Sequence, residues 1–232
     1  ECNIGSARII KMLNVKDDHL VVEAKGIYSI ENFLTARRLM YWQVYLHKTS
    51  VAYDEMLINT LLRAKELAAK GNDLFASPAL KFFLYNDVGR ESFYTNSECL
   101  ENFIQLDDND IWTALKVWCN HPDNVLSILS RNMIDRKTFK VEISNTPITK
   151  EHKKKLMENI SSQLDISLSE AIYFVSTPSV ERNMYNPADD SIDIIFNDGC
   201  VKNIAEASDM FNISLLSKKV KKYYICYQRL HS

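Results

Sequence analysis

The chain has little glycine and proline, and it has no long apolar run. Only five glycines and five prolines occur among its 232 residues. No glycine-rich phosphate loop or dinucleotide-binding fingerprint is present, and so few glycines leave little room for one. No apolar stretch reaches the roughly 20 residues that a membrane-spanning helix needs. We therefore expect neither a P-loop hydrolase, nor a Rossmann dehydrogenase, nor a membrane-spanning protein.

An excess of one charge is also missing. The chain has 28 basic and 30 acidic residues and a net charge of −2, so no strong overall field draws it to nucleic acid or anionic lipid. Its five cysteines form no Cys-x-x-Cys pair, and an odd count favours neither a disulfide framework nor a zinc knuckle. We expect reduced thiols and a cytoplasmic location, with neither a membrane nor nucleic acid as partner.

What is present is an ordinary globular composition, 46% hydrophobic and 25% charged. The patterning changes near residues 135–137, from helical periodicity to strand-like segments. We predict a mostly α protein with a smaller α+β C-terminal part: a helical region at 1–136, and a domain with a small mixed or antiparallel sheet at 137–232. The expected shorter helices are 7–13, 78–85, 97–106, 109–120, 123–135 and 149–164, and the expected strands are 20–23, 138–143, 171–176, 192–196 and 220–227.

The segment from Ile27 to Lys70 contains neither glycine nor proline. Its apolar residues recur near the helical period, and Gly71-Asn72 supplies a helix stop signal. At 1.5 Å per residue this segment would be roughly 60 Å long. Because Thr49-Ser50-Val51 weakens a helix, we expect one long helix with a bend there, or two collinear helices.

Four polar residues of this segment share one stripe of a helix. Arg37, Tyr41, Tyr45 and Lys48 fall at positions i, i+4, i+8 and i+11. Guanidinium and ammonium groups bind phosphate oxygens, and a tyrosine ring can stack on a sugar or base. The stripe therefore suits a phosphorylated ligand with a ring. The alternative is an amphipathic helix with half-buried tyrosines and extended basic side chains, and spacing alone favours that alternative.

The wider sequence adds a resemblance. The stretch Thr35–Lys48 contains Arg-x-x-Met-Tyr-x-Gln-Val-Tyr-x-His, and it resembles the HD-superfamily deoxynucleoside triphosphate triphosphohydrolases, a group that includes the mammalian SAM-and-HD-domain enzyme. The segments Asn3–Ile10, Leu106–Leu115 and Arg131–Lys140 are also similar to that family. The resemblance extends over residues 3–140 and is strongest to the bacterial members.

The resemblance implies an HD-type fold and a metal-dependent hydrolysis. In that family a His, a His-Asp pair and a later Asp bind a divalent metal (Mn, Mg, Fe or Zn). The metal activates water for attack on the α-phosphate and releases deoxynucleoside and triphosphate. None of the five histidines of this chain is followed by Asp. We therefore expect this chain to be the C-terminal half of such an enzyme, with its metal ligands upstream, no cofactor of its own and no activity alone.

The resemblance also implies roles for single residues. Arg37 matches a residue that grips the substrate phosphate, Tyr45 one that packs on the sugar, and Tyr41 belongs to the same substrate-binding wall. Leu46 stands where the mammalian enzyme has a Gln near the base, and Glu23 replaces a basic residue of its effector site. The residues implied as possible nucleotide or effector contacts are Arg8, Lys25, His47 and Lys48.

Two other functions remain open from the sequence. A long helical surface with a small sheet is also suited to a non-catalytic nucleotide-sensing or assembly module, and we expect a homo-oligomer in either case. Lysines 218–222 lie beside Tyr223, Tyr224 and Tyr227, a mixture that can bind single-stranded nucleic acid. The favoured alternative for these lysines is an edge strand that they protect from pairing.

Overall fold

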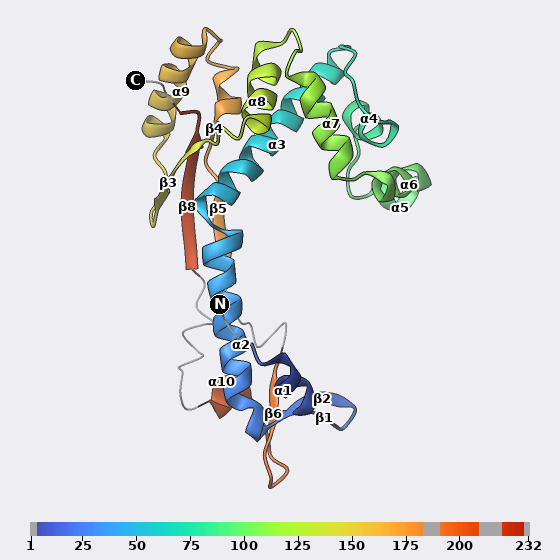
Figure 1. Cartoon of the computed structure of the whole chain (residues 1–232), viewed down its shortest axis with the longest axis vertical. Coiled ribbons are helices and arrows are strands. Elements are labelled where there is room, and N and C mark those ends of the chain that lie inside the picture. Colours follow the sequence, from blue (N-terminus) through green and yellow to red (C-terminus); the bar gives the residue numbers. More distant parts are fainter. Residues whose placement is uncertain (1–3, 183–190, 209–219, 230–232) are drawn as a thin grey trace. The chain divides into compact units, whose positions relative to one another are not determined.

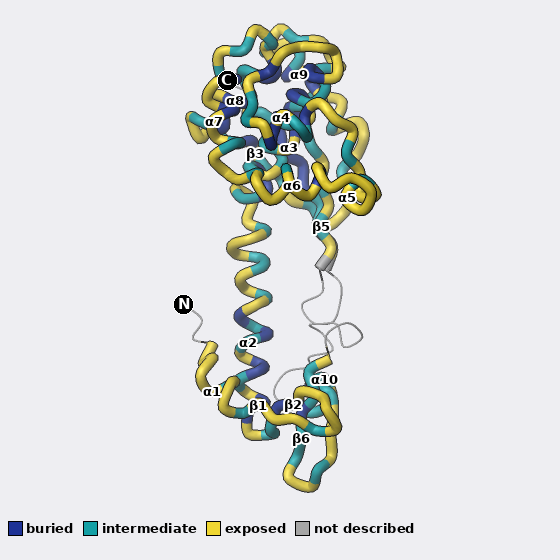
Figure 2. The backbone as a smooth tube through the Cα atoms, turned by 90° about the vertical axis from the view of Figure 1, so that its right-hand side faces the viewer, coloured by how far each residue is buried: buried dark blue, intermediate teal, exposed yellow. Residues whose placement is uncertain are grey.

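The computed structural model describes residues 4–182, 191–208 and 220–229, which are mostly helical with two small sheets (Figure 1). This confirms the predicted fold class. The chain forms two compact units: unit 1 consists of Glu1–His47 and Ser179–Lys222, and unit 2 of Lys48–Pro178 and Tyr223–Ser232. Buried residues collect inside each unit (Figure 2). The change of pattern at residue 136 falls within unit 2.

Unit 1 begins with helix α1 (Ser6–Lys11) and a hairpin of β1 (Leu13–Lys16) and β2 (His19–Glu23). The turn residues Asp17 and Asp18 have φ values of 51° and 62°. Two central residues with positive φ make a turn whose twist suits a two-residue hairpin, and Asp tolerates that conformation. The short helix and the strand at 20–23 are confirmed, whereas β1 was not predicted.

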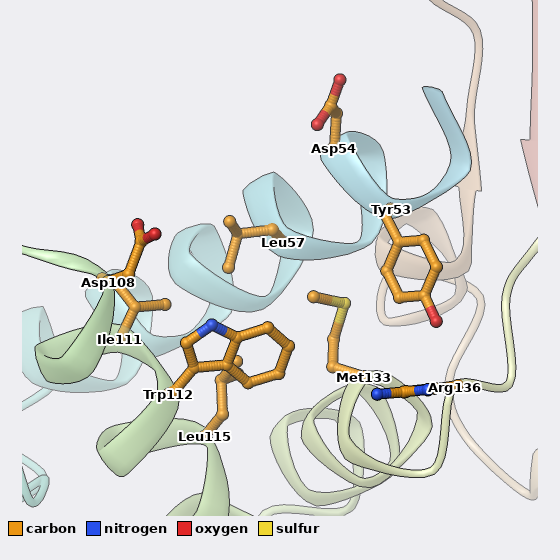
Figure 3. A pocket seen from close by; sticks show the side chains of 9 residues that line it. All are labelled: Tyr53, Asp54, Leu57, Asp108, Ile111, Trp112, Leu115, Met133 and Arg136. Atoms are coloured by element: carbon orange, nitrogen blue, oxygen red, sulfur yellow. The ribbon is translucent and has the colours of Figure 1, made fainter. Parts of the chain in front are cut away.

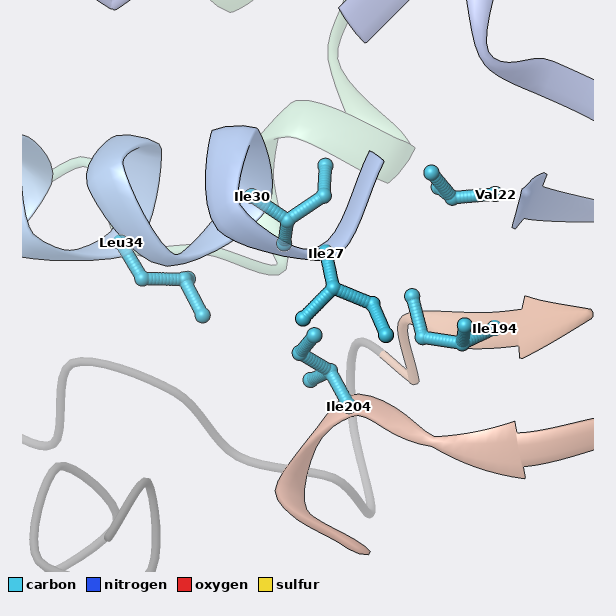
Figure 4. Packing of buried hydrophobic residues seen from close by; sticks show 6 residues of the cluster. All are labelled: Val22, Ile27, Ile30, Leu34, Ile194 and Ile204. Atoms are coloured by element: carbon cyan, nitrogen blue, oxygen red, sulfur yellow. The ribbon is translucent and has the colours of Figure 1, made fainter. Parts of the chain in front are cut away.

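The sheet of unit 1 joins distant parts of the sequence. Its order is β1-β2-β6-β7, with β6 at Asp193–Ile195 and β7 at Val201–Asn203. β2 and β6 run parallel, with Val22 opposite Ile194. Helix α10 (Ile204–Ala207) follows β7. A core of aliphatic side chains from the sheet and the helices packs together (Figure 4), namely Val22, Ile27, Ile30, Leu34, Ile194 and Ile204.

One glycine lets the hairpin approach the next helix closely. Gly26 ends the short 3-10 turn η1 (Ala24–Gly26). A Cβ atom at this position would lie 2.7 Å from Cγ1 of Val22 and 3.0 Å from Cβ of Met12. Since such contacts are shorter than van der Waals distance, a larger residue would push the hairpin away from the core.

The predicted long helical segment is helical with one interruption. It consists of α2 (Ile27–Met40), the π-helical turn η2 (Tyr41–Tyr45) and α3 (Lys48–Ala69). The interruption comes at residues 46–47, slightly before the expected bend. The C-terminus of α3 is as predicted: Gly71 has φ 84°, its N–H donates to the Ala68 carbonyl, and the Asn72 N–H donates to the Leu67 carbonyl. This is a Schellman motif.

Five helices of unit 2 begin at polar capping residues. Ser77 caps α4, Asn96 caps α6, and Asp107 forms a capping box on α7. Asp123 caps α8 and Thr149 caps α9. The sequence predicted both ends of all five of these helices to within two residues. The helix bounds are Pro78–Tyr85 (α4), Ser92–Thr95 (α5), Ser97–Gln105 (α6), Asp108–Trp118 (α7), Asn124–Ile134 (α8) and Lys150–Leu164 (α9).

The second sheet corrects two predictions. Its order is β3-β8-β4, from β3 (Lys140–Ser144), β8 (Val220–Tyr227) and β4 (Val175–Ser176), while β5 (Ser179–Arg182) also pairs with β8. The strand predicted at 171–176 is wrong at its start, because Ala171–Phe174 forms the 3-10 turn η3.

The interpretation of β8 as an edge strand is also wrong, because β8 lies between β3 and β4. Tyr224 and Tyr227 are buried in this central strand, so their rings are not available for stacking on bases. Lys218 and Lys219 lie outside the described residues. None of the helices in the described ranges is long and apolar enough to cross a bilayer.

Candidate functional site

The structure brings three of the predicted site residues together on unit 1. The Arg37 guanidinium carbon lies 5.9 Å from the centre of the Tyr41 ring, within cation–π range. The ring centres of Tyr41 and Tyr45 are 5.5 Å apart, with their planes tilted by 57°. Arg37 is exposed, Tyr41 is half-buried and Tyr45 is 58% exposed. These three residues, which we call the Arg37 stripe, present a cation and two rings to solvent.

The stripe continues the buried face of α2 beyond the core of unit 1. Ile30 and Leu34 are buried in that core. Arg37 and Tyr41 follow Leu34 by three and seven residues, which places them on the same side of the helix, where Arg37 is exposed and Tyr41 half-buried. At Tyr41 the helix widens, because the Leu46 N–H donates to the Tyr41 carbonyl at 2.8 Å, five residues back. Such π turns occur often at functional sites. The stripe therefore ends on a locally distorted backbone.

The other candidate residues are distributed over both units. In unit 1, the Arg8 guanidinium donates to the Lys25 carbonyl oxygen at 3.4 Å, and both side chains are exposed. His47 is exposed and lies two residues after the end of the π turn, with its N–H donating to the Val44 carbonyl at 3.3 Å. Lys48 begins α3 in unit 2, so it is not the continuation of one straight helical stripe.

Sequence reasoning missed one contact next to the stripe. The Lys222 ammonium lies 4.3 Å from the centre of the Trp42 ring, close enough for a cation–π interaction. Both residues belong to unit 1, although they are far apart in the sequence. The mixture of lysine and aromatic residues around Lys222 was visible in the sequence, but its partner Trp42 was not.

Unit 2 contains a separate open cavity of about 540 Å³ with none of the predicted residues in its lining (Figure 3). Its floor is apolar, and Trp112 lies across it. Arg136 and the Tyr53 hydroxyl lie at one side, whereas Asp108 lies at the other (Figure 3). The mixed charges of this lining do not select one class of ligand.

The described residues do not supply a metal site. Across the ranges that the structure describes, no three His, Cys, Asp or Glu side chains lie close enough to bind one ion. The donors present therefore do not fit the metal that the resemblance implies, and we assign no metal-dependent step to this chain's own residues.

A buried ion network stabilises unit 2 instead of forming a reactive site. The Arg63 side chain is only 7% exposed and bonds both oxygens of Asp123, at 3.1 and 2.6 Å. It also contacts Glu66 at 2.9 Å and Glu170 at 3.2 Å. The Asp123 hydrogen bond is the main reason that the pKa of Arg63 is raised. Every charge of this network has an opposite partner, which is typical of a structural role.

The same network lowers the pKa of a carboxylate. Hydrogen bonds from Lys70, Tyr173 and Arg63 lower the pKa of Glu66 from 4.5 to about 2. Burial, followed by the hydrogen bond to Glu66, raises the pKa of Tyr173 to about 12. Since the charged form of Glu66 is favoured in the folded state, it stabilises the fold above pH 4.5, and this contribution is lost as pH falls toward 2.

We therefore expect the melting temperature to fall as pH is lowered from about 5 to about 2.5, partly through Glu66. Thermal melts across this range should show a smaller fall for Glu66→Gln than for the unchanged chain, because the variant has no carboxylate to protonate. Parallel falls in the two proteins would contradict this role of Glu66.

The chain is similar to several known proteins. The family described as HD associated region matches residues 4–76, which include the Arg37 stripe. The uncharacterized protein YwfO of Bacillus subtilis (strain 168) is 25% identical over 207 residues, or 87% of this chain and 45% of YwfO.

Solved structures extend the similarity. A phosphohydrolase from Bacteroides thetaiotaomicron VPI-5482 is 76% identical with a TM-score of 0.92, over 98% of this chain and 56% of that one. A hypothetical protein from Aquifex aeolicus, 23% identical with a TM-score of 0.57 over 96% of this chain, shares the fold. The chain spans about half the length of these relatives. Residues 4–76 thus match an HD-associated region, and the chain is related to a phosphohydrolase.

Proposed function

We propose that this chain forms the substrate-binding wall of an HD-type, metal-dependent phosphohydrolase that cleaves deoxynucleoside triphosphates into deoxynucleoside and inorganic triphosphate. The Arg37 stripe carries the proposal, because it places one guanidinium beside two aromatic rings on an outward surface. The match to an HD-associated region and the similarity to a phosphohydrolase support it.

Each residue of the stripe has a physical role in this proposal. The Arg37 guanidinium binds phosphate oxygens through its fork of N–H donors. The Tyr41 ring beneath it holds the guanidinium in place, which reduces the entropy lost when the phosphate binds. The exposed Tyr45 ring packs against the sugar, where its edge leaves no room for a 2′-hydroxyl.

The metal belongs to another part of the protein in this proposal. When bound, it would lower the pKa of a water molecule and neutralise charge at the α-phosphate. This chain's contribution is to bind and orient the triphosphate and the sugar. We therefore expect nucleotide binding but no turnover from the chain alone.

The test uses a chimeric protein, in which this chain replaces the matched segment of the Bacteroides phosphohydrolase, and we call this chimera the joined protein. With Mn²⁺, the joined protein should release inorganic triphosphate from deoxynucleoside triphosphates, detected by ion chromatography. The same assay with nucleoside monophosphates should give no phosphate. Hydrolysis of monophosphates alone would contradict the substrate class, and nucleotide binding without any turnover would favour a nucleotide-sensing module instead.

A further inference from the structure

Unit 1 carries an apolar groove that is separate from the Arg37 stripe. A cavity of about 390 Å³ is lined by α1, the β1–β2 hairpin, α2 and the segment that leads into β6, and we call it the α1 groove. Among the described residues that line it, Asp193 alone is charged. Its aliphatic lining includes Ile9, Ile10, Leu13, Leu20, Ile30 and Ile192.

The elements around the groove expose aliphatic side chains that would normally be buried. Helix α1 buries none of its residues, and Ile10 is 67% exposed. In the hairpin, Val15 and Leu20 lie opposite each other and are 64% and 65% exposed. A helix or hairpin in a globular protein usually turns one apolar face to a core. A continuous apolar surface of this kind usually marks an interface.

We propose that the α1 groove is the docking surface for the metal-binding portion of the phosphohydrolase, an inference that rests on the proposed function. The Bacteroides relative is 76% identical across nearly all of this chain, yet 44% of its own length lies outside the match. That additional portion needs an apolar surface to pack against. The α1 groove offers one, and most of the described residues that line it are apolar.

The occupant therefore presents an apolar helix face or strand face to the groove, and its polar groups lie outside the contact. Burying the exposed part of an Ile side chain at such an interface is worth about a tenfold change in association. A second copy of this chain could also cover the groove, and the experiment separates these two occupants.

The experiment compares two matched isoleucine substitutions. Ile10→Asp places a charge in the α1 groove, whereas Ile104→Asp does so on α6 in unit 2, where Ile104 is 72% exposed. Because both side chains are already exposed, each substitution should shift the melting temperature of the isolated chain by less than about 2 °C. In the joined protein, Ile10→Asp should lower the melting temperature by about 3 °C or more, and Ile104→Asp should not.

A second measurement uses the two portions expressed together as separate polypeptides. Ile10→Asp should weaken their association by about tenfold or more in calorimetry, and residues 6–22 should lose hydrogen-exchange protection when the partner is removed. Equal effects of the two substitutions would overturn the proposal. So would an isolated chain that is a dimer and becomes a monomer on Ile10→Asp, since a second copy would then be the occupant.

The outcomes distinguish this inference from the proposed function. If Ile10→Asp acts selectively but the joined protein does not cleave deoxynucleoside triphosphates, the docking surface is supported and the proposed function is wrong. If the joined protein releases triphosphate but Ile10→Asp has no selective effect, the proposed function is supported and the docking surface is wrong.

Discussion

Replacement of Arg37 by alanine should lower kcat/KM of the joined protein for deoxynucleoside triphosphates by about a hundredfold or more, because a charged donor to the phosphate is lost. Its metal content should stay the same, because Arg37 is not a metal ligand. Steady-state kinetics and elemental analysis of the same preparation check both parts.

Arg38→Ala is the matched control for this prediction. It removes the same charge from the adjacent position of α2, but Arg38 is not part of the stripe. Its kcat/KM should stay within about threefold of the unchanged protein, since surface charges act weakly on a site through screened solvent. If Arg37→Ala left kcat/KM unchanged, the assignment of Arg37 to the substrate phosphate would be wrong.

Loss of the Arg63 guanidinium should have the largest effect on stability. Arg63→Met should lower the free energy of unfolding by about 3–5 kcal/mol, because it leaves Asp123 partly buried without its opposite charge. Methionine fills much of the same space, so the loss reports the charges more than the packing. Denaturant unfolding followed by circular dichroism measures the change.

The control for Arg63 is an exposed ion pair on another helix. Lys81 is 52% exposed and lies 3.4 Å from Asp73, so Lys81→Met should cost less than about 1 kcal/mol. Adding Asp123→Asn to Arg63→Met should recover part of the lost stability, because the uncompensated carboxylate is then removed. Similar losses for Arg63→Met and Lys81→Met would show that the buried network does not stabilise unit 2.

The sequence predicted the helices well because their signals are local. Ser77, Asp107 and Asp123 mark helix starts within a few residues of the turns that they cap, and Gly71 marks an end. The central place of β8 could not be predicted in this way. Strand partners are chosen by packing between distant segments, and the lysines near residue 220 are equally compatible with an edge strand.

Only part of the candidate site could be predicted, because some of its features are local in the sequence and others depend on tertiary structure. Helical spacing found Arg37, Tyr41 and Tyr45, and the structure places their side chains in contact. The π turn was not predicted, because one additional residue in a helical turn has no compositional signal. The contact of Trp42 with Lys222 depends on tertiary structure, so no local pattern indicates it.

The pairing of distant strands also sets an order of events during synthesis. β2 leaves the ribosome well before its parallel partner β6, which follows only after nearly all of unit 2. At a typical elongation rate the hairpin waits roughly ten to thirty seconds for that partner. The last described strand, β8, must then insert between β3 and β4. The helices of unit 2 can therefore assemble as the chain grows, whereas the two sheets close only after β6, β7 and β8 have been made. Until then the hairpin lacks its partner strand and is exposed to aggregation, from which chaperones protect such segments.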